Sequence, residues 1–178
     1  AVAMEASNID LPEYGEYGAG LVFLPNDAAQ SRKCQDIIEK IITDEGQTVL
    51  GWREVPTNDS SLGPTAKISE PTFKQIFIGK GSNVKDEAAF ERKLFVIRKL
   101  AENAIWSSDL SECQRFYIPS LSYRTFIYKG MLTVNQLGDW LTHLDMLPIT
   151  VRLILHVVMQ TGCVQEKPYA SQNYSVMI

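Results

Sequence analysis

The sequence predicts one layered domain of mixed α/β or α+β class, with a sheet that is not purely parallel. Two observations predict it. Segments with strand character alternate along the chain with segments of helical periodicity. Near residue 120, two short strand-like segments flank a Ser-Tyr pair, which predicts a β-hairpin and therefore antiparallel pairing. The length of 178 residues, 45% of them hydrophobic and 21% charged, is typical of one globular domain with a core.

Three strands are expected in the first half of the chain. Residues 17–25 (YGAGLVFLP) form an apolar run, which predicts a buried strand. Gly18 and Gly20 at its start indicate that another segment approaches the backbone closely there. Residues 47–56 and 72–79 have strand-like patterns and are separated by turn-forming residues.

The first helix is expected between the first two strands. Asn26 or Asp27 is its predicted N-cap, it runs to about Glu45, and Gly46 follows at the position where glycine commonly ends a helix. Its apolar residues recur at helical spacing and form one stripe: Cys34, Ile37, Ile38, Ile41 and Ile42.

A second helix is expected from about Asp86 to Trp106, followed by the hairpin. The helix has charged residues on one face and an apolar face on the other, comprising Phe90, Leu94, Ile97, Leu100 or Ala101, and Ala104. The predicted hairpin pairs residues 116–121 with residues 124–130 around Ser122 and Tyr123.

The last third of the chain has a weaker pattern. Thr133 and Gln136 have capping-box spacing, which predicts a short helix. Residues 149–159 are rich in β-branched side chains and predict a strand, whereas from Gln160 onward no period is visible.

Composition excludes several classes of function. The formal net charge is −4 without a Lys/Arg stripe, which argues against nucleic-acid binding. The longest apolar run, residues 153–159, is too short to cross a bilayer, and the first ten residues lack the features of a signal peptide. We therefore expect no membrane partner.

The cysteines and histidines favour neither a disulfide framework nor a metal site. Cys34, Cys113 and Cys163 are widely spaced and odd in number, so we interpret them as reduced thiols. The chain has only two histidines, His143 and His156, which limits both metal binding and Cys–His catalysis. His156 lies in an apolar strand pattern and is interpreted as a core residue.

Two glycine-rich segments resemble phosphate-binding loops only superficially. Residues 79–82 (GKGS) lack the first glycine of a phosphate loop, so a strand-to-helix loop is the favoured interpretation. Residues 15–20 (GEYGAG) precede a strand, whereas a dinucleotide fingerprint follows one.

Other polar residues admit both a chemical and a structural interpretation. Ser120 and Ser122 are nucleophiles in principle, but no nucleophile elbow or nearby histidine accompanies them. A hairpin turn explains both serines. Three carboxylates, Asp44, Glu45 and Glu54, flank one strand and are better explained as solvated element ends.

Trp52 and Arg53 are the most suggestive pair. The arginine is expected either to stack on the indole and fix a loop or to bind a carboxylate, and the structural role is favoured. Arg124 and Lys129 carry the same alternatives, with exposed strand positions as the simpler interpretation.

Five blocks together resemble the amino-terminal glutamine amidotransferase domain of the glutamate synthase large chain. They occur in the family's order over roughly residues 12–144. Those at 48–66 and 116–132 are the most specific. The blocks are GEYGAGLVFLP, TVLGWREVPTNDSSLGPTA, EPTFKQIFI, FERKLFVIRKLAENAI and FYIPSLSYRTFIYKGML.

The resemblance implies a fold and a reaction. The fold would be α+β, the four-layer α/β/β/α arrangement of the N-terminal nucleophile (Ntn) hydrolases, here incomplete. The reaction would be hydrolysis of the glutamine side-chain amide by an amino-terminal cysteine, which forms a glutamyl thioester and releases ammonia. In the parent enzyme, ammonia would reach a domain containing FMN and an iron–sulfur cluster and combine there with 2-oxoglutarate. The rest of the glutamate synthase chain would be the partner, in the cytoplasm or the plastid stroma.

The chain departs from the family at both ends. It starts at Ala1 without the catalytic cysteine, and no cysteine in the chain matches the nucleophile's motif. His156 lies near a family histidine, but the expected arginine and the later Asn-Gly motif are absent. We therefore assign no catalytic, cofactor-binding or metal residues and expect this chain to be inactive by itself.

The chain divides into two parts on this basis. Residues 1–144 are interpreted as an interior part of the amidotransferase domain. Residues 145–178 do not match the family, and a frame error in the gene and true divergence are alternative hypotheses for them. The alternative function is a non-catalytic interaction or structural module derived from the same fold.

Overall fold

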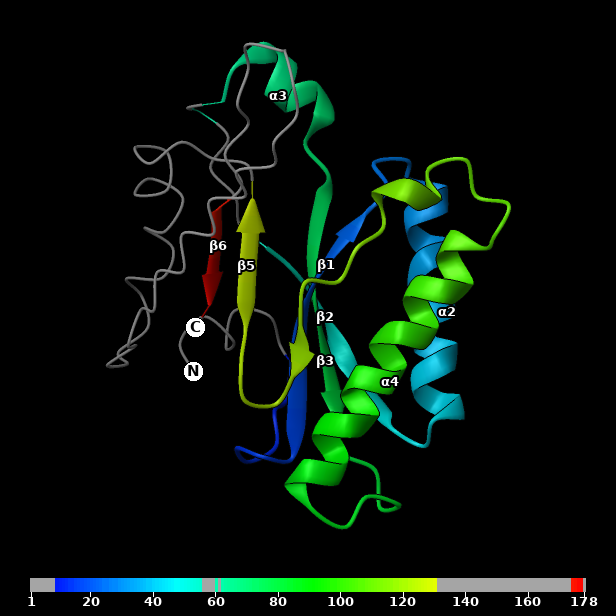
Figure 1. Cartoon of the computed structure of the whole chain (residues 1–178), viewed down its shortest axis with the longest axis vertical. Helices are drawn as coiled ribbons and strands as arrows, with labels where there is room; N and C mark the ends of the chain where they lie inside the picture. Colours follow the sequence, from blue (N-terminus) through cyan, green and yellow to red (C-terminus); the bar gives the residue numbers. More distant parts are fainter. Residues whose placement is uncertain (1–8, 56–59, 61, 131–173, 178) are drawn as a thin grey trace, which may run out of the picture.

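An antiparallel sheet of four strands forms the centre of the protein (Figure 1). The computed structural model describes residues 9–55, 60, 62–130 and 174–177. The strands are β1 (Tyr17–Leu24), β2 (Thr48–Glu54), β3 (Thr72–Gly79) and β4 (Leu121–Ser122), in the spatial order β2-β3-β1-β4. The three longer strands agree with the prediction to within two residues at each end.

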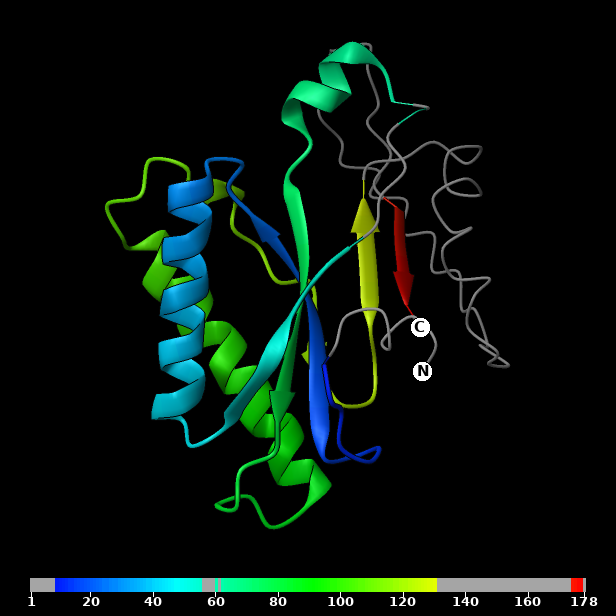
Figure 2. The same ribbon diagram turned by 180° about the vertical axis from the view of Figure 1, so that it is seen from behind.

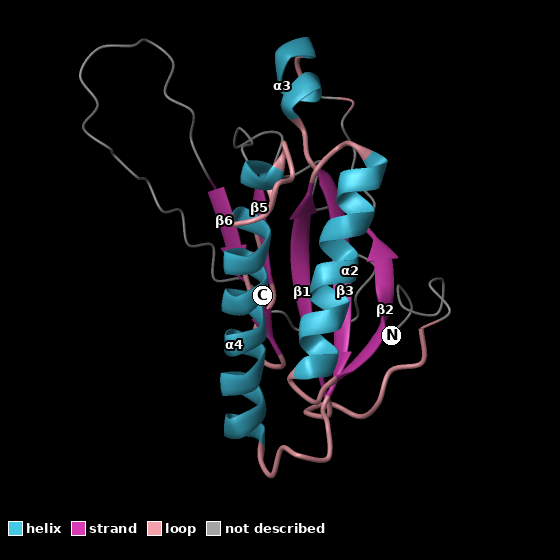
Figure 3. Cartoon of the chain, turned by 90° about the vertical axis from the view of Figure 1, so that its right-hand side faces the viewer, coloured by secondary structure: helices cyan, strands magenta, loops and turns pink. Residues whose placement is uncertain are grey.

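Two long helices cover one face of this sheet. Helix α2 (Ala28–Asp44) and helix α4 (Glu87–Trp106) lie side by side across it, as Figure 3 shows. Both were predicted with nearly these bounds. Between them and the sheet lies a core of buried residues that includes Val22, Leu24, Ile38, Ile42, Ile76, Ile78, Phe90, Leu94 and Ile97.

Two further strands lie on the opposite side of the sheet. β5 (Ile127–Gly130) pairs antiparallel with β6 (Tyr174–Met177), and β5 contacts β1. Figure 2, seen from behind, shows this pair separated from the helices by the four-stranded sheet. The described residues therefore form three layers: helices, a four-stranded sheet and a two-stranded sheet.

Both helices have the caps that their sequences encode. The Asp27 carboxylate accepts a hydrogen bond from the Gln30 amide at 2.9 Å, and the Asp86 carboxylate accepts one from the Ala89 amide at 2.7 Å. Of the two predicted caps of α2, Asp27 is therefore the one used. The side-chain amide of Asn26 instead donates to the Glu70 carbonyl at 2.7 Å.

Gly46 ends α2 as predicted. Its φ of 72° is in the left-handed region, where glycine avoids a Cβ clash. The Gly46 amide bonds to the Thr43 carbonyl, and the Gln47 amide bonds to the Ile42 carbonyl. These two bonds are those of a Schellman motif, which satisfies carbonyls at the helix end and directs the chain into β2.

The helix stripes are confirmed in part. In α4, Phe90, Leu94, Ile97 and Ala101 are buried. Leu100 is 41% exposed, so of the two predicted alternatives, Leu100 and Ala101, it is Ala101 that lies in the core. Ala104 is exposed, contrary to the prediction, and Ile105 is buried instead. In α2, Cys34, Ile38 and Ile42 are buried, whereas Ile37 and Ile41 are only partly buried.

The two glycines of β1 confirm the predicted close approach. A Cβ on Gly18 would lie 2.5 Å from the Leu94 side chain of α4, and a Cβ on Gly20 would lie 2.7 Å from the Ser120 carbonyl oxygen. Real Cβ contacts are essentially never this short, so the glycines allow α4 and the chain before β4 to pack directly against β1.

The predicted hairpin is wrong. β4 pairs with β1, with Leu121 opposite Gly20, and β5 pairs with β6. The hydroxyl of Ser122 accepts hydrogen bonds from the Arg124 and Thr125 amides, which turns the chain away from the first sheet. Residues 121–130 thus cross from one sheet to the other. Antiparallel pairing, which the sequence predicts, does occur, between β1 and β3.

Some elements differ from the prediction or lie outside the described residues. A short helix, α3 (Pro64–Ser69), was not predicted, and β6 lies in a region where no period was visible. A single turn of 3-10 helix, η1 (Cys113–Arg115), precedes β4. The predicted helix after Thr133 and the predicted strand at 149–159 fall outside the described residues.

Candidate functional site

The face of the four-stranded sheet that is turned away from the helices is the first candidate site. Residues alternate between the two faces of a strand, and the residues of β1 and β3 that are paired on this face are Ala19 with Phe77, Leu21 with Gln75, and Phe23 with Phe73. Leu21 is fully buried. The rings of Phe23 and Phe73 meet edge to face, 4.9 Å apart. The result is an apolar floor beneath β5.

Two polar residues lie side by side on this floor. Gln75 is buried, and its cross-strand neighbour in β2 is Arg53. A guanidinium and an amide can together bind a carboxylate or an amide group. On this face the described residues of β1, β2 and β3 provide no cysteine, serine or histidine. Ser122 of β4 lies opposite Ala19, and its hydroxyl accepts hydrogen bonds from the Arg124 and Thr125 amides.

A groove between α4 and the chain around β4 is the second candidate. It is open to solvent, with a volume of about 540 Å³. Arg98 at its edge donates a hydrogen bond to the Pro119 carbonyl at 3.1 Å, which holds the two walls together. The other main lining residues are Arg92, Phe95, Val96, Leu121 and Ile127. Its apolar walls suit an apolar segment of a protein better than a small polar substrate.

The two serines are engaged by the backbone. The Ser120 hydroxyl accepts a hydrogen bond from the Ile127 amide at 3.0 Å, and the Ser122 hydroxyl accepts from Arg124 and Thr125 at 3.0 and 3.1 Å. These bonds shape the crossover between the sheets. The structural interpretation of both serines is therefore supported, although by a crossover and not by a hairpin turn.

Trp52 and Arg53 lie on opposite faces of the sheet. The Trp52 indole donates to the Glu39 carboxylate of α2 at 2.8 Å, so its ring lies on the helix side. Arg53 pairs in register with Gln75, on the other side. Because the two side chains point apart, Arg53 does not stack on the Trp52 ring.

The three carboxylates near β2 are not brought together. Glu45 pairs with Lys93 at 2.7 Å, and Glu54 pairs with Lys74 at 2.8 Å. Asp44 pairs with Lys40, one turn before it in α2. Each carboxylate thus has its own lysine, and no paired-carboxylate site forms among them.

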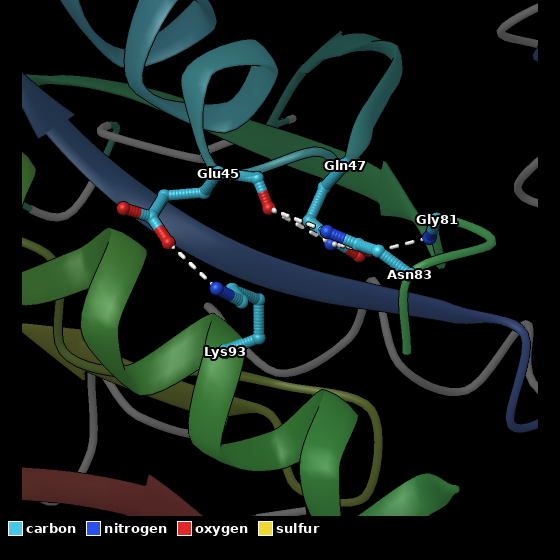
Figure 4. A network of polar contacts seen from close by, with 5 residues as sticks. All are labelled: Glu45, Gln47, Gly81, Asn83 and Lys93. Atoms are coloured by element: carbon cyan, nitrogen blue, oxygen red, sulfur yellow. Dashed lines mark hydrogen bonds and ion pairs between the residues drawn. The ribbon is translucent and has the colours of Figure 1, made fainter. Parts of the chain in front are cut away.

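The GKGS loop is held by hydrogen bonds instead of being open to phosphate (Figure 4). The Gly81 amide donates to the Gln47 side-chain oxygen at 2.9 Å, and the Gln47 side-chain nitrogen donates to Asn83 at 3.0 Å and to the Glu45 carbonyl at 3.1 Å. Lys80 is paired with Glu16. The loop joins β3 to α4, as the favoured interpretation expected.

Two of the three cysteines are described. Cys34 is fully buried in α2, and Cys113 begins η1 and is half-buried. Burial, and to a lesser degree the nearby Cys113, raise the pKa of the Cys34 thiol from 9.0 to about 11. Cys34 therefore stays protonated at neutral pH and is a poor nucleophile. Cys163 and both histidines, His143 and His156, lie outside the described residues.

Arg124 lies over the ring of Tyr123, 5.9 Å from its centre. The Tyr123 hydroxyl donates to the Glu87 carboxylate at 3.0 Å, and the Tyr123 amide donates to Glu91 at 3.2 Å. Desolvation and the Glu87 carboxylate raise the pKa of the Tyr123 phenol. These contacts tie the crossover to the first turns of α4. Lys129 belongs to β5, and its side chain is not described.

Neither a metal centre nor a membrane helix is found in the described part of the chain. No group of three or more His, Cys, Asp or Glu residues there has the arrangement of a metal site. No helix there combines the length and the apolar character that crossing a bilayer requires.

Sequence reasoning missed two structurally central polar residues. Gln47 is buried and joins three segments, and its place directly after the helix-ending Gly46 was the available signal. Glu102 was not singled out among the charged residues of α4, yet its side chain is 2% exposed. It pairs with Lys99 at 2.7 Å and with Arg98 at 3.5 Å.

Comparison with known proteins gives one family and several relatives. The class-II glutamine amidotransferase family matches residues 1–164. The chain is 45% identical over 141 residues to the glutamate synthase [NADPH] large chain of Bacillus subtilis (strain 168), covering 79% of this chain and 9% of that protein. It is 42% identical over 125 residues to a chloroplastic ferredoxin-dependent glutamate synthase of Oryza sativa subsp. japonica, covering 69% and 7%. A large chain from Azospirillum brasilense is 39% identical over 119 residues, covering 66% and 8%. The chain thus spans less than a tenth of the length of these relatives.

Proposed function

The chain belongs to the class-II glutamine amidotransferases, and we propose that it supplies scaffold for the glutaminase domain of a glutamate synthase. The fold of this family is that of the Ntn hydrolases, of α+β class, and the two facing sheets and the helix layer described above belong to it. The observation that carries the proposal is the joint match to the family and to glutamate synthases over most of the chain.

The proposed reaction of the complete domain is hydrolysis of the side-chain amide of glutamine. An amino-terminal cysteine would attack the amide carbon, ammonia would leave, and water would hydrolyse the thioester to glutamate. The ammonia would serve glutamate synthesis from 2-oxoglutarate in a domain that contains FMN and an iron–sulfur cluster. In this chain, the polar pair Arg53 and Gln75 on the inner sheet face is the candidate for contact with the bound substrate or its surroundings.

We propose that the 178 residues alone do not hydrolyse glutamine. Of the described cysteines, Cys34 is buried and protonated, and Cys113 begins a turn of 3-10 helix on the helix side of the sheet. Ser120 and Ser122 accept backbone hydrogen bonds. The purified chain should therefore release no ammonia from glutamine, and measurable, enzyme-dependent release would overturn this part of the proposal.

A chimeric enzyme tests the scaffold function. Residues 12–144 would replace the matching segment of the Bacillus subtilis large chain, which keeps its own nucleophile and remaining domains. Glutaminase activity within about tenfold of the parent is expected, because at this identity the layers should pack in the same way. The parent with its nucleophile removed is the control. A soluble, folded chimera without glutaminase activity would contradict the proposal.

The alternative is a non-catalytic interaction module, and one observation favours it. Phe95 and Val96, on the outer face of α4 beside the groove, are 56% and 40% exposed. Exposed apolar residues that line a groove are typical of protein contacts. An inactive chimera combined with a monomeric, stable chain would favour this alternative.

The proposed location is the cytoplasm or the plastid stroma. The rice relative is named chloroplastic, and the other two relatives are bacterial large chains. The proposed partner is the remainder of a glutamate synthase chain.

A further inference from the structure

The two long helices present different outer faces to solvent. On α2, the exposed side chains are mostly charged and some pair with each other, for example Arg32 with Asp36 at 2.9 Å. On α4, four large apolar side chains are exposed: Phe95 at 56%, Val96 at 40%, Leu100 at 41% and Trp106 at 44%. The α2 face is that of a solvated helix, whereas the α4 face is typical of a surface that another protein segment covers.

The exposed apolar face of α4 continues into the groove beside it. Phe95 and Val96 line this groove from α4, and Leu121 and Ile127 line it from the opposite wall. The groove has a volume of about 540 Å³, and the hydrogen bond from Arg98 to the opposite wall joins its two sides. Its concave shape suits a protruding segment of protein better than a flat bilayer surface.

This face of α4 is cationic, although the whole chain has a net charge of −4. After Glu87, the exposed residues of the helix include two cations, Arg92 and Lys99, and no carboxylate. Glu87 and Glu91, in the first turns, accept hydrogen bonds from the hydroxyl and the amide of Tyr123. The face therefore complements an acidic partner.

The two cations differ in what they already bind. Lys99 pairs with the buried Glu102 at 2.7 Å. Arg92, which also lines the groove, has no ion-pair partner among the described residues. A guanidinium at the edge of an apolar groove can bind a carboxylate through two parallel hydrogen bonds. Arg92 is thus the anchor point that the surface offers to an acidic side chain.

Charge also argues against a second copy of the chain as the occupant. A twofold contact centred between Phe95 and Val96 would set Arg92 of one copy opposite Lys99 of the other, because the two cations are equally far from that centre. A parallel contact would set each cation opposite itself. Both arrangements bring like charges together, so the favoured occupant is a different, acidic segment.

We propose that the outer face of α4 and its groove dock a segment from another domain of the same large chain. The segment would place apolar side chains over Phe95 and Val96 and a carboxylate against Arg92. The length of chain outside the structure supports this occupant, since the match to the Bacillus subtilis large chain covers only 9% of that protein. The assignment of this surface rests on the proposed function, because that function places these residues within a longer synthase chain.

Photo-crosslinking in the chimera of residues 12–144 with the Bacillus subtilis large chain tests the surface. Phe95→p-benzoylphenylalanine would carry the photoreactive group. The matched control is Lys40→p-benzoylphenylalanine on the charged face of α2, where the side chain is 74% exposed. From position 95, the expected product is a link to a peptide outside the amidotransferase domain that contains apolar and acidic residues. Position 40 should give no such link.

Two further readings of the same experiment make its outcome decisive. Mixing isotope-labelled and unlabelled chimera distinguishes a link within one chain from a link between copies. A link between copies, a link confined to the amidotransferase domain, or no link from position 95 would overturn the proposal. Glutaminase activity is measured on the same preparation. An inactive chimera counts against the scaffold function, whereas an active chimera without the expected link counts against the docking surface alone.

Charge reversal tests the chemistry of the contact. Arg92→Glu should lower the yield of the link from position 95 roughly threefold or more, because the partner carboxylate would then face a like charge. Lys33→Glu, at an exposed position of α2, is the control and should leave the yield unchanged. Equal yields in the two variants would contradict a carboxylate at Arg92. Binding of the chimera to vesicles of anionic phospholipid, lost in Arg92→Glu, would assign the face to a membrane and would also overturn the proposal.

Discussion

The indole of Trp52 donates a hydrogen bond to the Glu39 carboxylate at 2.8 Å, and this contact joins β2 to α2. β2 is an outer strand of the four-stranded sheet and is hydrogen-bonded to β3 alone among the described strands. Because an outer strand has one sheet neighbour, its contacts with the helix layer contribute more to its position than they would for a central strand.

Replacing Trp52 with Phe should lower the free energy of unfolding by roughly 1–2 kcal/mol, because the donor to a carboxylate is lost while most of the ring remains. Urea unfolding measures the loss. Glu39→Gln keeps a neutral acceptor and should cost less. The double mutant separates the hydrogen bond from ring packing, and additive losses would mean that the two residues are not coupled.

Replacing Gln47 with Ala should destabilise the chain by roughly 1–3 kcal/mol, because the Gly81 amide and the Asn83 side chain lose a buried partner. The neighbouring, exposed Thr48→Ala is the matched control and should change little. Hydrogen exchange gives a second measurement, in which the Gly81 amide should exchange faster in Gln47→Ala. Unchanged exchange at Gly81 would contradict the network in Figure 4.

Replacing Gly20 with Ala should be among the more damaging small substitutions, with a loss of roughly 1–3 kcal/mol. Its Cβ would meet the Ser120 carbonyl oxygen at 2.7 Å, and backbone atoms move less easily than side chains. Gly18→Ala should cost less, because its Cβ meets the end of the Leu94 side chain. Gly63→Ala is the control, since nothing lies within 4 Å of the new Cβ. Equal thermal stability of the Gly20 and Gly63 variants would contradict the close approach.

The pKa of Cys34 makes stability depend on pH in the alkaline range. Below the unfolded-state value of 9.0, the thiol is protonated in both states and the full stability is present. As pH rises from 9.0 to about 11, only the unfolded chain loses the proton, so roughly 2–3 kcal/mol of stability is lost. Urea unfolding at several pH values measures the slope. Cys34→Ala should remove this contribution, and an identical slope in that variant would disprove it.

Much of the fold could be predicted because its signals are local. The periodicity of α4, the Asp27 and Asp86 caps and the Gly46 terminus depend on residues within a turn or two of each other. The predicted bounds of both long helices and three strands therefore agree closely with the structure.

Strand pairing could not be predicted in the same way. The spacing of residues 116–130 is compatible with a hairpin, and only the partners β1 and β6, both distant in sequence, show that the two strands belong to different sheets. Ser122, which looked like a turn residue, does form a turn, but between layers. The local sequence therefore predicts that the chain turns at Ser122, but it does not determine which strands β4 and β5 pair with.

The candidate site was even less accessible to sequence reasoning. Trp52 and Arg53 are adjacent in sequence, which suggested joint action, yet the strand directs them to opposite faces. The register between β2 and β3 also places Arg53 opposite Gln75. An irregularity in the β2–β3 register between Val49 and Gly51 shifts this pairing by one residue, and no turn or cap signal marks it.

The central position of β1 has a consequence for synthesis on the ribosome. Among the described strands β1 is made first, but its two neighbours, β3 and β4, come from residues 72–79 and 121–122. At roughly 5–20 residues per second, β1 waits on the order of ten seconds for its second neighbour. Until β3 is made, both hydrogen-bonding edges of β1 are unpaired, and until β4 is made, one edge stays unpaired. An unpaired edge is available for pairing with other chains. Chaperones that shield extended apolar segments should therefore bind nascent chains that end between residues 24 and 72 more strongly than chains that extend past residue 122.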